Sequence, residues 1–386
     1  MKPHSTLHIV LSGIGCASLL IYILACSTSF SPDDSQVLYP SFDPQSGATS
    51  VAVYDRKTKH SEQLFSAIAP ATSTNRDRLL IRAEWLPDGQ HILVARLLGN
   101  DEKGLSFLLL PRGAKEPVRE FAFPDFDEPA GVLEFPFAIN GSQLVLNTSN
   151  RLAALDLFSG EITRSTATNK IVPLPAPDGK TLIGVLDLGD NHTEFGTIDP
   201  QTLAFKPAVQ LTNQFADGCI PAFNPTDGRI ALVITESNQP ALQIIKDGQI
   251  EFSRPLNHSA DKLVVGPFLD FTPDRKGVVS AYCAQADGQT NAEYGLIEIP
   301  LNQKPLRFTP LFHARKSSDD TDLLFAQPSL SHDGKTWAIA TTYLYLQSES
   351  LAPADCALFL VNLTKAGRPV TKIPIPVPAD RAKLVK

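Results

Sequence analysis

The sequence predicts an all-β protein, a β-propeller of seven four-stranded antiparallel blades. Two observations lead to this fold. A hairpin motif centred on Asp-Gly recurs along the chain at intervals typical of propeller blades, and a second hairpin follows each copy. Six or eight blades are the alternatives. With 386 residues and 43% hydrophobic content, the chain is long enough to close one such domain around a large core.

The first hairpin consists of an apolar run, Pro-Asp-Gly or a variant of it, a basic residue and a second apolar run. Asp-Gly between alternating apolar residues is the strongest short hairpin signal, because Asp accepts backbone hydrogen bonds within its own turn and Gly adopts a positive φ. Copies of this motif occupy 83–95, 134–146, 173–185, 221–233, 269–281 and 328–340.

The second hairpin has Asp or Asn near the end of its first strand, as in 151–165, 240–254 and 356–373. Successive copies of the first hairpin begin about 39 to 59 residues apart, which matches the period of propeller blades. The first blade lacks a full first hairpin, so we expect a strand from 368–378 to complete it. The predicted blades are 36–66, 81–122, 133–166, 171–211, 219–255, 266–311 and 325–375.

Residues 1–26 are predicted to be a targeting segment. Lys2 is the only firm charge at its start, and an apolar stretch from about 7 to 24 has a length shared by signal sequences and membrane spans. The segment ends in Ile23-Leu24-Ala25-Cys26, which resembles the lipobox of bacterial lipoproteins. This resemblance implies a cleaved signal peptide and a diacylglycerol on the Cys26 sulfur. An uncleaved anchor and ordinary secretion are the alternatives.

The lipobox resemblance also implies a location in the bacterial cell envelope. By resemblance to enterobacterial lipoprotein sorting, serine rather than aspartate at position 27 implies the periplasmic side of the outer membrane. Residues 27–35 would then form a short tether that reaches about 30 Å at roughly 3.3 Å per residue. The propeller would occupy 36–378, and 379–386 would form a basic tail.

The hairpin repeats resemble the WD-like Ser-Pro-Asp-Gly repeats of the TolB-like propellers, which are periplasmic and other exported proteins. The likeness extends over about 340 residues and rests on the Asp-Gly pairs at 88–89, 178–179, 227–228 and 333–334. It implies the fold and says little about function. TolB carries a globular domain before its propeller, whereas only the predicted tether precedes the first blade here, so the propeller is expected to lie close to the bilayer.

Motifs for catalysis are missing from the sequence. It has no Gly-x-Ser-x-Gly nucleophile elbow, and its eight histidines show no zinc-ligand spacing. Segment 331–337 is similar to a sialidase Asp-box but aligns with the other turns, and no tyrosine–glutamate pair for a sialidase site can be assigned. A net charge of −7 disfavours nucleic acid as a partner. We therefore expect no enzymatic activity, no cofactor and no metal centre.

Three acidic loops are the candidate sites for a partner or an ion. Strand direction alternates within a blade, so the Asp-Gly turns fall on one face, while connections between blades and between second and third strands fall on the other. All three acidic loops share this second face, where propellers commonly bind ligands by fold analogy. None follows the twelve-residue calcium-loop pattern. The candidate residues are Asp125, Asp127 and Glu128; Asp287, Asn291 and Glu293; and Asp319, Asp320 and Asp322.

The sequence thus favours a non-enzymatic, lipid-anchored monomer that binds an envelope protein or peptide on its acidic face. The alternatives are a lactonase- or hydrolase-like propeller enzyme acting on a small molecule or glycan, and a structural scaffold. Cys219, Cys283 and Cys356 remain after Cys26. We favour three free thiols over a disulfide or a soft-metal site, because neighbouring blades diverge outward and a disulfide needs Cα atoms within about 7 Å.

Overall fold

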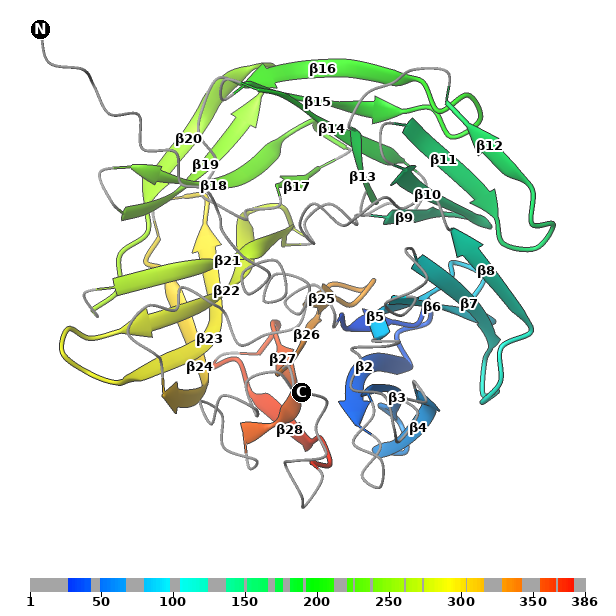
Figure 1. Cartoon of the computed structure of the whole chain (residues 1–386). Helices are drawn as coiled ribbons and strands as arrows, with labels where there is room; N and C mark the ends of the chain where they lie inside the picture. The colour runs from blue at the N-terminus through cyan, green and yellow to red at the C-terminus, as the bar shows by residue number, and fades with distance from the viewer. Residues whose placement is uncertain are drawn as a thin grey trace, which may run out of the picture.

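The fold is seen in a computed structural model, in which seven four-stranded antiparallel sheets are arranged radially (Figure 1). This confirms the all-β fold class and the seven-blade prediction over six or eight blades. Within the described residues no helix is long and apolar enough to cross a membrane. The structure describes residues 27–42, 49–66, 80–97, 105–123, 137–148, 151–165, 171–175, 181–189, 192–211, 221–224, 226–236, 239–259, 262–272, 274–302, 304–315, 328–341, 355–365 and 367–377.

Each blade takes its four strands from one continuous stretch of chain, in sequence order from the centre outward. Blades one to four contain β1 (Ser29–Phe30), β2 (Gln36–Phe42), β3 (Thr49–Asp55), β4 (His60–Ser66); β5 (Leu80–Trp85), β6 (His91–Leu97), β7 (Leu105–Pro111), β8 (Arg119–Phe123); β9 (Phe137–Asn140), β10 (Gln143–Thr148), β11 (Arg151–Asp156), β12 (Ile162–Arg164); and β13 (Ile171–Pro175), β14 (Leu182–Gly189), β15 (His192–Ile198), β16 (Phe205–Leu211). Blades five to seven contain β17 (Ala222–Phe223), β18 (Ile230–Glu236), β19 (Gln239–Lys246), β20 (Gln249–Pro255); β21 (Lys262–Phe271), β22 (Gly277–Gln285), β23 (Asn291–Pro300), β24 (Arg307–Arg315); and β25 (Ser329–Leu330), β26 (Thr336–Ala340), β27 (Ala357–Asn362), β28 (Val370–Pro374).

The core lies between the blades, where the two middle strands of one sheet pack against those of the next. In β22 every residue but the last is buried, and all five residues of β26 are buried. A strand that is covered on both faces has no solvent face, so its sequence is a continuous apolar run rather than an alternating one. The outermost strands carry the polar surface, and all three residues of β12 are exposed.

The hairpin turns between first and second strands are built by local side-chain bonds, as predicted. At 331–336 the Ser331 hydroxyl donates to Asp333 Oδ1 at 2.8 Å and accepts from the Thr336 backbone N–H at 2.9 Å. The same pair of bonds forms around Thr272 and around Ser31. Hydrogen bonds from the Ser31 hydroxyl and from Ser35 hold the pKa of Asp33 down at about 2. Glycines follow the Asp at a positive φ, for example Gly334 at 68°.

The first blade is complete, and the prediction that a strand from 368–378 completes it is wrong. That segment contains β28, which is the outermost strand of blade seven. The innermost strand of blade one is β1, which pairs with β2 through Ser29–Leu38 and Phe30–Val37. Residues 31–36 form a hairpin turn of the repeat type, in which Asp34 takes the glycine position at φ 55°.

The chain joins the ring directly after position 26. Ser27 and Thr28, which were predicted to be tether, are each only 4% exposed, and β1 follows them. The Ser27 hydroxyl donates to the Ala83 carbonyl of blade two at 3.1 Å. Residues 27–30 therefore belong to the propeller, because Ser27 and Thr28 are buried against it and Ser29–Phe30 form its first strand. The predicted signal segment 1–26 and basic tail 379–386 lie outside the described residues.

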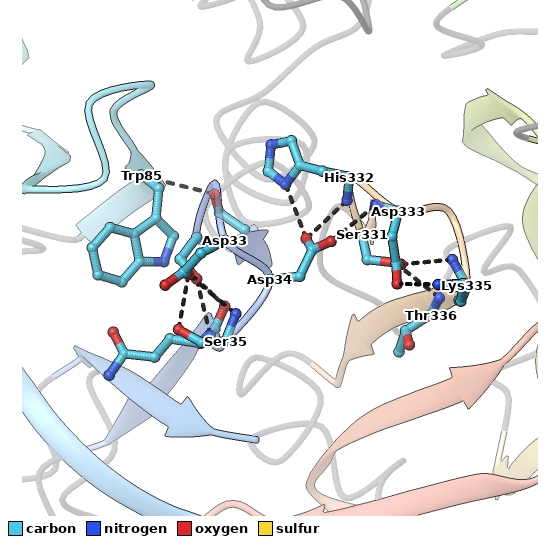
Figure 2. Close-up of polar contacts among 12 residues, drawn as sticks. Asp33, Asp34, Ser35, Trp85, Ser331, His332, Asp333, Lys335 and Thr336 are labelled. Carbon is cyan, nitrogen blue, oxygen red and sulfur yellow. Dashed lines mark hydrogen bonds and ion pairs between the residues drawn. The ribbon is translucent and has the colours of Figure 1, made fainter. Parts of the chain in front are cut away.

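Side chains of blades seven and one close the ring. The Asp34 carboxylate accepts hydrogen bonds from the backbone N–H groups of His332 at 2.8 Å and Asp333 at 2.9 Å, and Oδ1 lies 3.0 Å from His332 Nδ1 (Figure 2). Toward the ring centre, the Thr28 hydroxyl bonds the Ala338 carbonyl at 3.0 Å. An apolar cluster drawn from blades six, seven and one packs behind these bonds. Closure therefore uses side chains instead of a strand shared between the two ends of the chain.

Replacing Asp34 by alanine is expected to lower the free energy of unfolding by about 1–3 kcal/mol, because two backbone N–H groups of blade seven lose a charged acceptor. Asp247→Ala is the matched control. Asp247 also has a positive φ, 50°, but lies in a turn of blade five away from the closure. Urea denaturation of both variants would show the effect. Equal losses in the two variants would mean that the Asp34 contacts contribute nothing to closure.

Candidate binding face

The two ends of the propeller differ in what they carry. We call the end with the turns between first and second strands, such as 31–35, 272–276 and 331–335, the hairpin side. The opposite end, where each second strand joins the third, is the loop side. The turn 286–290 between β22 and β23 lies on the loop side. This matches the face on which the sequence analysis places the acidic loops.

One of the three predicted acidic loops is described. Asp287 is exposed within the turn that follows β22, Asn291 is the exposed first residue of β23, and Glu293 is half-buried two residues further along. Residues two apart on a strand share a face, so Asn291 and Glu293 lie on the same face of the sheet. The candidates that lie outside the described residues are Asp125, Asp127, Glu128, Asp319, Asp320, Asp322 and Cys26.

Glu293 is the centre of a polar cluster, which we call the Glu293 cluster; its other members are Tyr282, His258 and His313. The Tyr282 hydroxyl donates to Glu293 Oε1 at 2.6 Å. His258 Nε2 lies 3.7 Å from the same oxygen, and His313 Nε2 lies 3.6 Å from Oε2. Tyr282 comes from β22, His313 from β24, and His258 from the connection between blades five and six.

Aromatic rings pack together on the buried side of the Glu293 cluster. The Phe308 ring meets His258 edge-on at 4.6 Å between centroids and meets Tyr282 edge-on at 5.0 Å. Tyr282 is fully buried, and burial raises the pKa of its hydroxyl, as does the hydrogen bond to Glu293. Tyr282 therefore serves as a neutral donor that holds the carboxylate in place. A buried phenol with a raised pKa is unsuited to act as a nucleophile.

The outer edge of the Glu293 cluster is open to solvent. The His313 side chain is 65% exposed, and the Glu293 side chain is 25% exposed. A carboxylate can accept several hydrogen bonds, so Glu293 can accept further donors from a bound molecule after its bond from Tyr282. In the part of the chain that the structure describes, no three His, Cys, Asp or Glu side chains are arranged to hold a metal ion. The exposed edge of the Glu293 carboxylate can take part in polar recognition.

The sequence analysis singled out only Glu293 of the four residues in this cluster. Glu293 and His313 lie directly opposite each other across β23 and β24. His258 reaches them from the connection that follows the preceding blade. None of these relations has a fixed spacing in the sequence, because the length of each connection varies between blades. Only strand register brings the four side chains together.

A second unusual carboxyl lies at the inner edge of the interface between blades six and seven. Asp270 is partly buried on the innermost strand β21, and burial raises the pKa of its carboxyl to about 7. The indole N–H of Trp337 in blade seven lies near this carboxyl without meeting hydrogen-bond geometry, so it offsets the burial only in part. Trp337 itself is fully buried. Asp270 therefore keeps its proton at pH values at which an exposed carboxyl is already ionised.

Cys283 and Cys356 form no disulfide and are buried in the apolar cluster that spans blades six, seven and one. Burial raises the pKa of Cys356 to about 11, which suppresses its thiolate form. The structure thus agrees with the free-thiol prediction for these two residues. Cys219 lies outside the described residues.

Thiol titration of the mature protein tests all three residues. The denatured, unreduced protein is expected to react at three sites, whereas Cys283 and Cys356 are expected to stay unreactive in the folded protein because they are buried. Reaction with a thiol reagent before and after denaturation gives both counts. A single thiol after denaturation would reveal a disulfide and contradict the prediction.

Comparisons with known proteins find similar folds at low sequence identity. No protein-family model and no curated protein matches the chain. A chain in the crystal structure of the mitotic checkpoint complex is 13% identical, with 83% of this chain and 84% of that chain covered and a TM-score of 0.50. TolB from Acinetobacter baumannii is 18% identical, with 72% and 66% covered and a TM-score of 0.40. An oligogalacturonate lyase from Vibrio parahaemolyticus is 13% identical, with 88% and 85% covered and a TM-score of 0.48.

These similar structures differ in what their names describe, and their identities are low. Likeness at this level shows the fold alone. The likeness to the checkpoint-complex chain agrees with the sheet topology that the described strands form, seven radial sheets of four antiparallel strands each. The chain is a seven-bladed β-propeller.

Proposed function

We propose that this chain is a non-enzymatic, envelope-anchored propeller that binds a protein or peptide partner on its loop side. The observation that carries the proposal is the Glu293 cluster. Its carboxylate is fixed from below by Tyr282 and is flanked by the exposed His313, while Asp287 and Asn291 are exposed close by in the sequence. A rigid base with polar groups at its rim is typical of a recognition surface.

The hairpin side uses its carboxylates differently. Asp88 accepts hydrogen bonds from the backbone N–H groups of Gln90 and His91, and Asp274 accepts one from Lys276. The pKa of Asp88 is lowered by these bonds and by His91, despite an opposing effect of burial. These carboxylates stabilise their own turns. The carboxylates of the loop side are the better candidates for contact with a partner.

The chemistry of the proposed surface favours a basic partner segment. Carboxylates bind arginine and lysine through charge-assisted hydrogen bonds, and arginine can bind both oxygens at once. Glu293 keeps an exposed edge for such a donor, and Asp287 adds a second negative charge at the adjacent turn. The sequence motif Ile23-Leu24-Ala25-Cys26 supports a lipid on Cys26 and hence attachment of a monomer to the envelope, on the periplasmic side of the outer membrane.

Affinity capture from the native envelope tests partner binding. The double variant Asp287→Asn, Glu293→Gln is expected to retain less than about a tenth of the captured partner, since each lost charge-assisted bond costs about 1.5–3 kcal/mol. Asp247→Asn on the hairpin side is the control and should capture the wild-type amount. Melting temperatures of all variants must agree. Full capture by the double variant, or loss in the control, would contradict the proposed surface.

Metabolic labelling tests the anchor separately. Cells given an alkyne fatty acid are expected to label the wild-type chain and not the Cys26→Ala variant. Equal labelling of both would contradict lipidation at Cys26.

A further inference from the structure

The first four residues of the described chain are held by three consecutive blades. Ser27 bonds the Ala83 carbonyl of blade two, and Thr28 bonds both Ser329 Oγ and the Ala338 carbonyl of blade seven, each at 3.0 Å. The backbone N–H of Trp85 in blade two donates to Ser29 Oγ at 3.2 Å. Ser27 and Thr28 are almost fully buried. Position 26 is therefore joined to the body of the propeller without a flexible linker.

The direction of β1 decides on which side the chain enters. From Phe30 the chain runs into the turn 31–35, which belongs to the hairpin side. Ser27, at the other end of this stretch, therefore lies toward the loop side of the innermost strands. Consecutive Cα atoms are about 3.8 Å apart. An anchor at Cys26 is attached within one residue of the ring wall and on the loop side of β1.

We propose that the anchor holds the propeller with its loop side toward the bilayer, so that the Glu293 cluster meets a basic segment of a protein embedded in the same membrane. This inference rests on the proposed anchoring and partner binding. A tether of nine extended residues would let the propeller turn over, whereas a one-residue link to a buried segment does not. The loop side is then accessible to molecules at the membrane surface and the hairpin side to molecules further away.

Charge selects the partner class. The exposed edge of the Glu293 cluster and the Asp287 turn present carboxylates, and an anionic bilayer surface is repelled by them. Lysine and arginine residues next to a membrane span lie at the membrane surface, which the anchored loop side faces. Their positive charge attracts them to anionic surfaces. A basic juxtamembrane segment is complementary in charge to the loop side and lies where the anchored loop side can contact it. A free, basic periplasmic protein would be complementary in charge only.

Fluorescence quenching measures the orientation. Two variants of the full chain are prepared on a Cys219→Ser background. One carries a dye at Asp287→Cys on the loop side, and the other carries it at Asp247→Cys on the hairpin side. Cys283 and Cys356 do not react with the dye because they are buried. In vesicles with nitroxide-labelled lipid headgroups, we expect quenching at least threefold stronger at 287 than at 247. A 20-residue Gly-Ser insertion between Cys26 and Ser27 adds about 25 Å of flexible reach and should equalise the two sites. Equal or reversed quenching without the insertion would overturn the orientation.

Photo-crosslinking identifies the partner class. A benzophenone group at Gln289, an exposed neighbour of Asp287 in the same turn, is expected to crosslink an integral membrane protein in the native envelope, and one at position 247 should not. Crosslinking from 289 to a soluble protein, from 247 alone or from neither position would overturn the proposed partner. Alkyne fatty-acid labelling of the same preparation distinguishes a failure of the proposed anchoring from a failure of the proposed orientation. An unlabelled, unanchored chain refutes the anchoring and this inference with it, whereas a labelled chain with reversed quenching refutes the orientation alone.

Discussion

Replacing Gly295 by alanine is expected to lower the free energy of unfolding by about 3 kcal/mol or more, one of the largest effects of any single methyl group in this protein. A Cβ at this position would lie 2.3 Å from the Thr309 carbonyl oxygen and 2.7 Å from a ring carbon of Tyr282. Gly295 lies at an irregularity in the pairing of β23 with β24, where the register shifts after Tyr294. The backbone of β24 must move outward to admit the methyl group.

The same substitution is expected to weaken partner binding, because the Tyr282 ring cannot move without disturbing its bond to Glu293. Gly288→Ala is the matched control in the same blade. Gly288 has nothing within 4 Å of its added Cβ and a φ of 73°, so its cost is limited to backbone strain of about 1–2 kcal/mol. Thermal and urea denaturation would rank the two variants. A Gly295→Ala variant as stable as Gly288→Ala would refute the close approach of the two strands.

The Asp270→Asn variant is expected to be more stable than the wild type at pH 8 and about equal to it at pH 4. In the unfolded chain this carboxyl has a pKa near 3.9, whereas burial raises its pKa to about 7 in the folded protein. Between these pH values the unfolded state has released the proton that the folded state retains. The free energy of unfolding therefore falls as pH rises from about 4 to 7.

The size of the Asp270 effect follows from the difference between the two pKa values. That difference corresponds to about 4 kcal/mol at most, and partial exposure of Asp270 brings the expected gain to about 2–4 kcal/mol. Asp274→Asn is a control of opposite sign. The hydrogen bonds from Thr272 and Lys276 outweigh burial and lower the pKa of Asp274, so Asp274→Asn should lose stability at pH 8. Urea denaturation at several pH values measures both. An Asp270→Asn variant less stable than the wild type at pH 8 would contradict the prediction.

The blade count could be predicted from the sequence because each hairpin carries its own turn chemistry. Within 331–336, for example, Ser331, Asp333 and Gly334 satisfy the turn by bonds that reach no more than five residues along the chain. Such local bonds do not depend on the rest of the fold, so their sequence pattern was recognised in six of the seven blades. The strand β1 was missed because two residues are too few to show any periodicity.

The candidate site, in contrast to the blade count, could be predicted from the sequence only in part. Asp287, Asn291 and Glu293 were recognised as an acidic loop on one face, since alternating strand direction is fixed once the hairpins are known. Tyr282, His258 and His313 were not, because they reach Glu293 from the neighbouring strands and the preceding connection.

The sequence by itself therefore determined the repeat, its hairpin turns and the side on which the 286–290 turn lies, all of which follow from contacts between near neighbours in the chain. The tertiary structure alone decided how blade seven meets blade one through Asp34, how Trp337 lies against Asp270, and how Ser27 is buried beside Ala83. Each of these contacts joins residues of different blades. They exist only once the sheets are arranged in a ring, and no spacing along the chain encodes the distance across it.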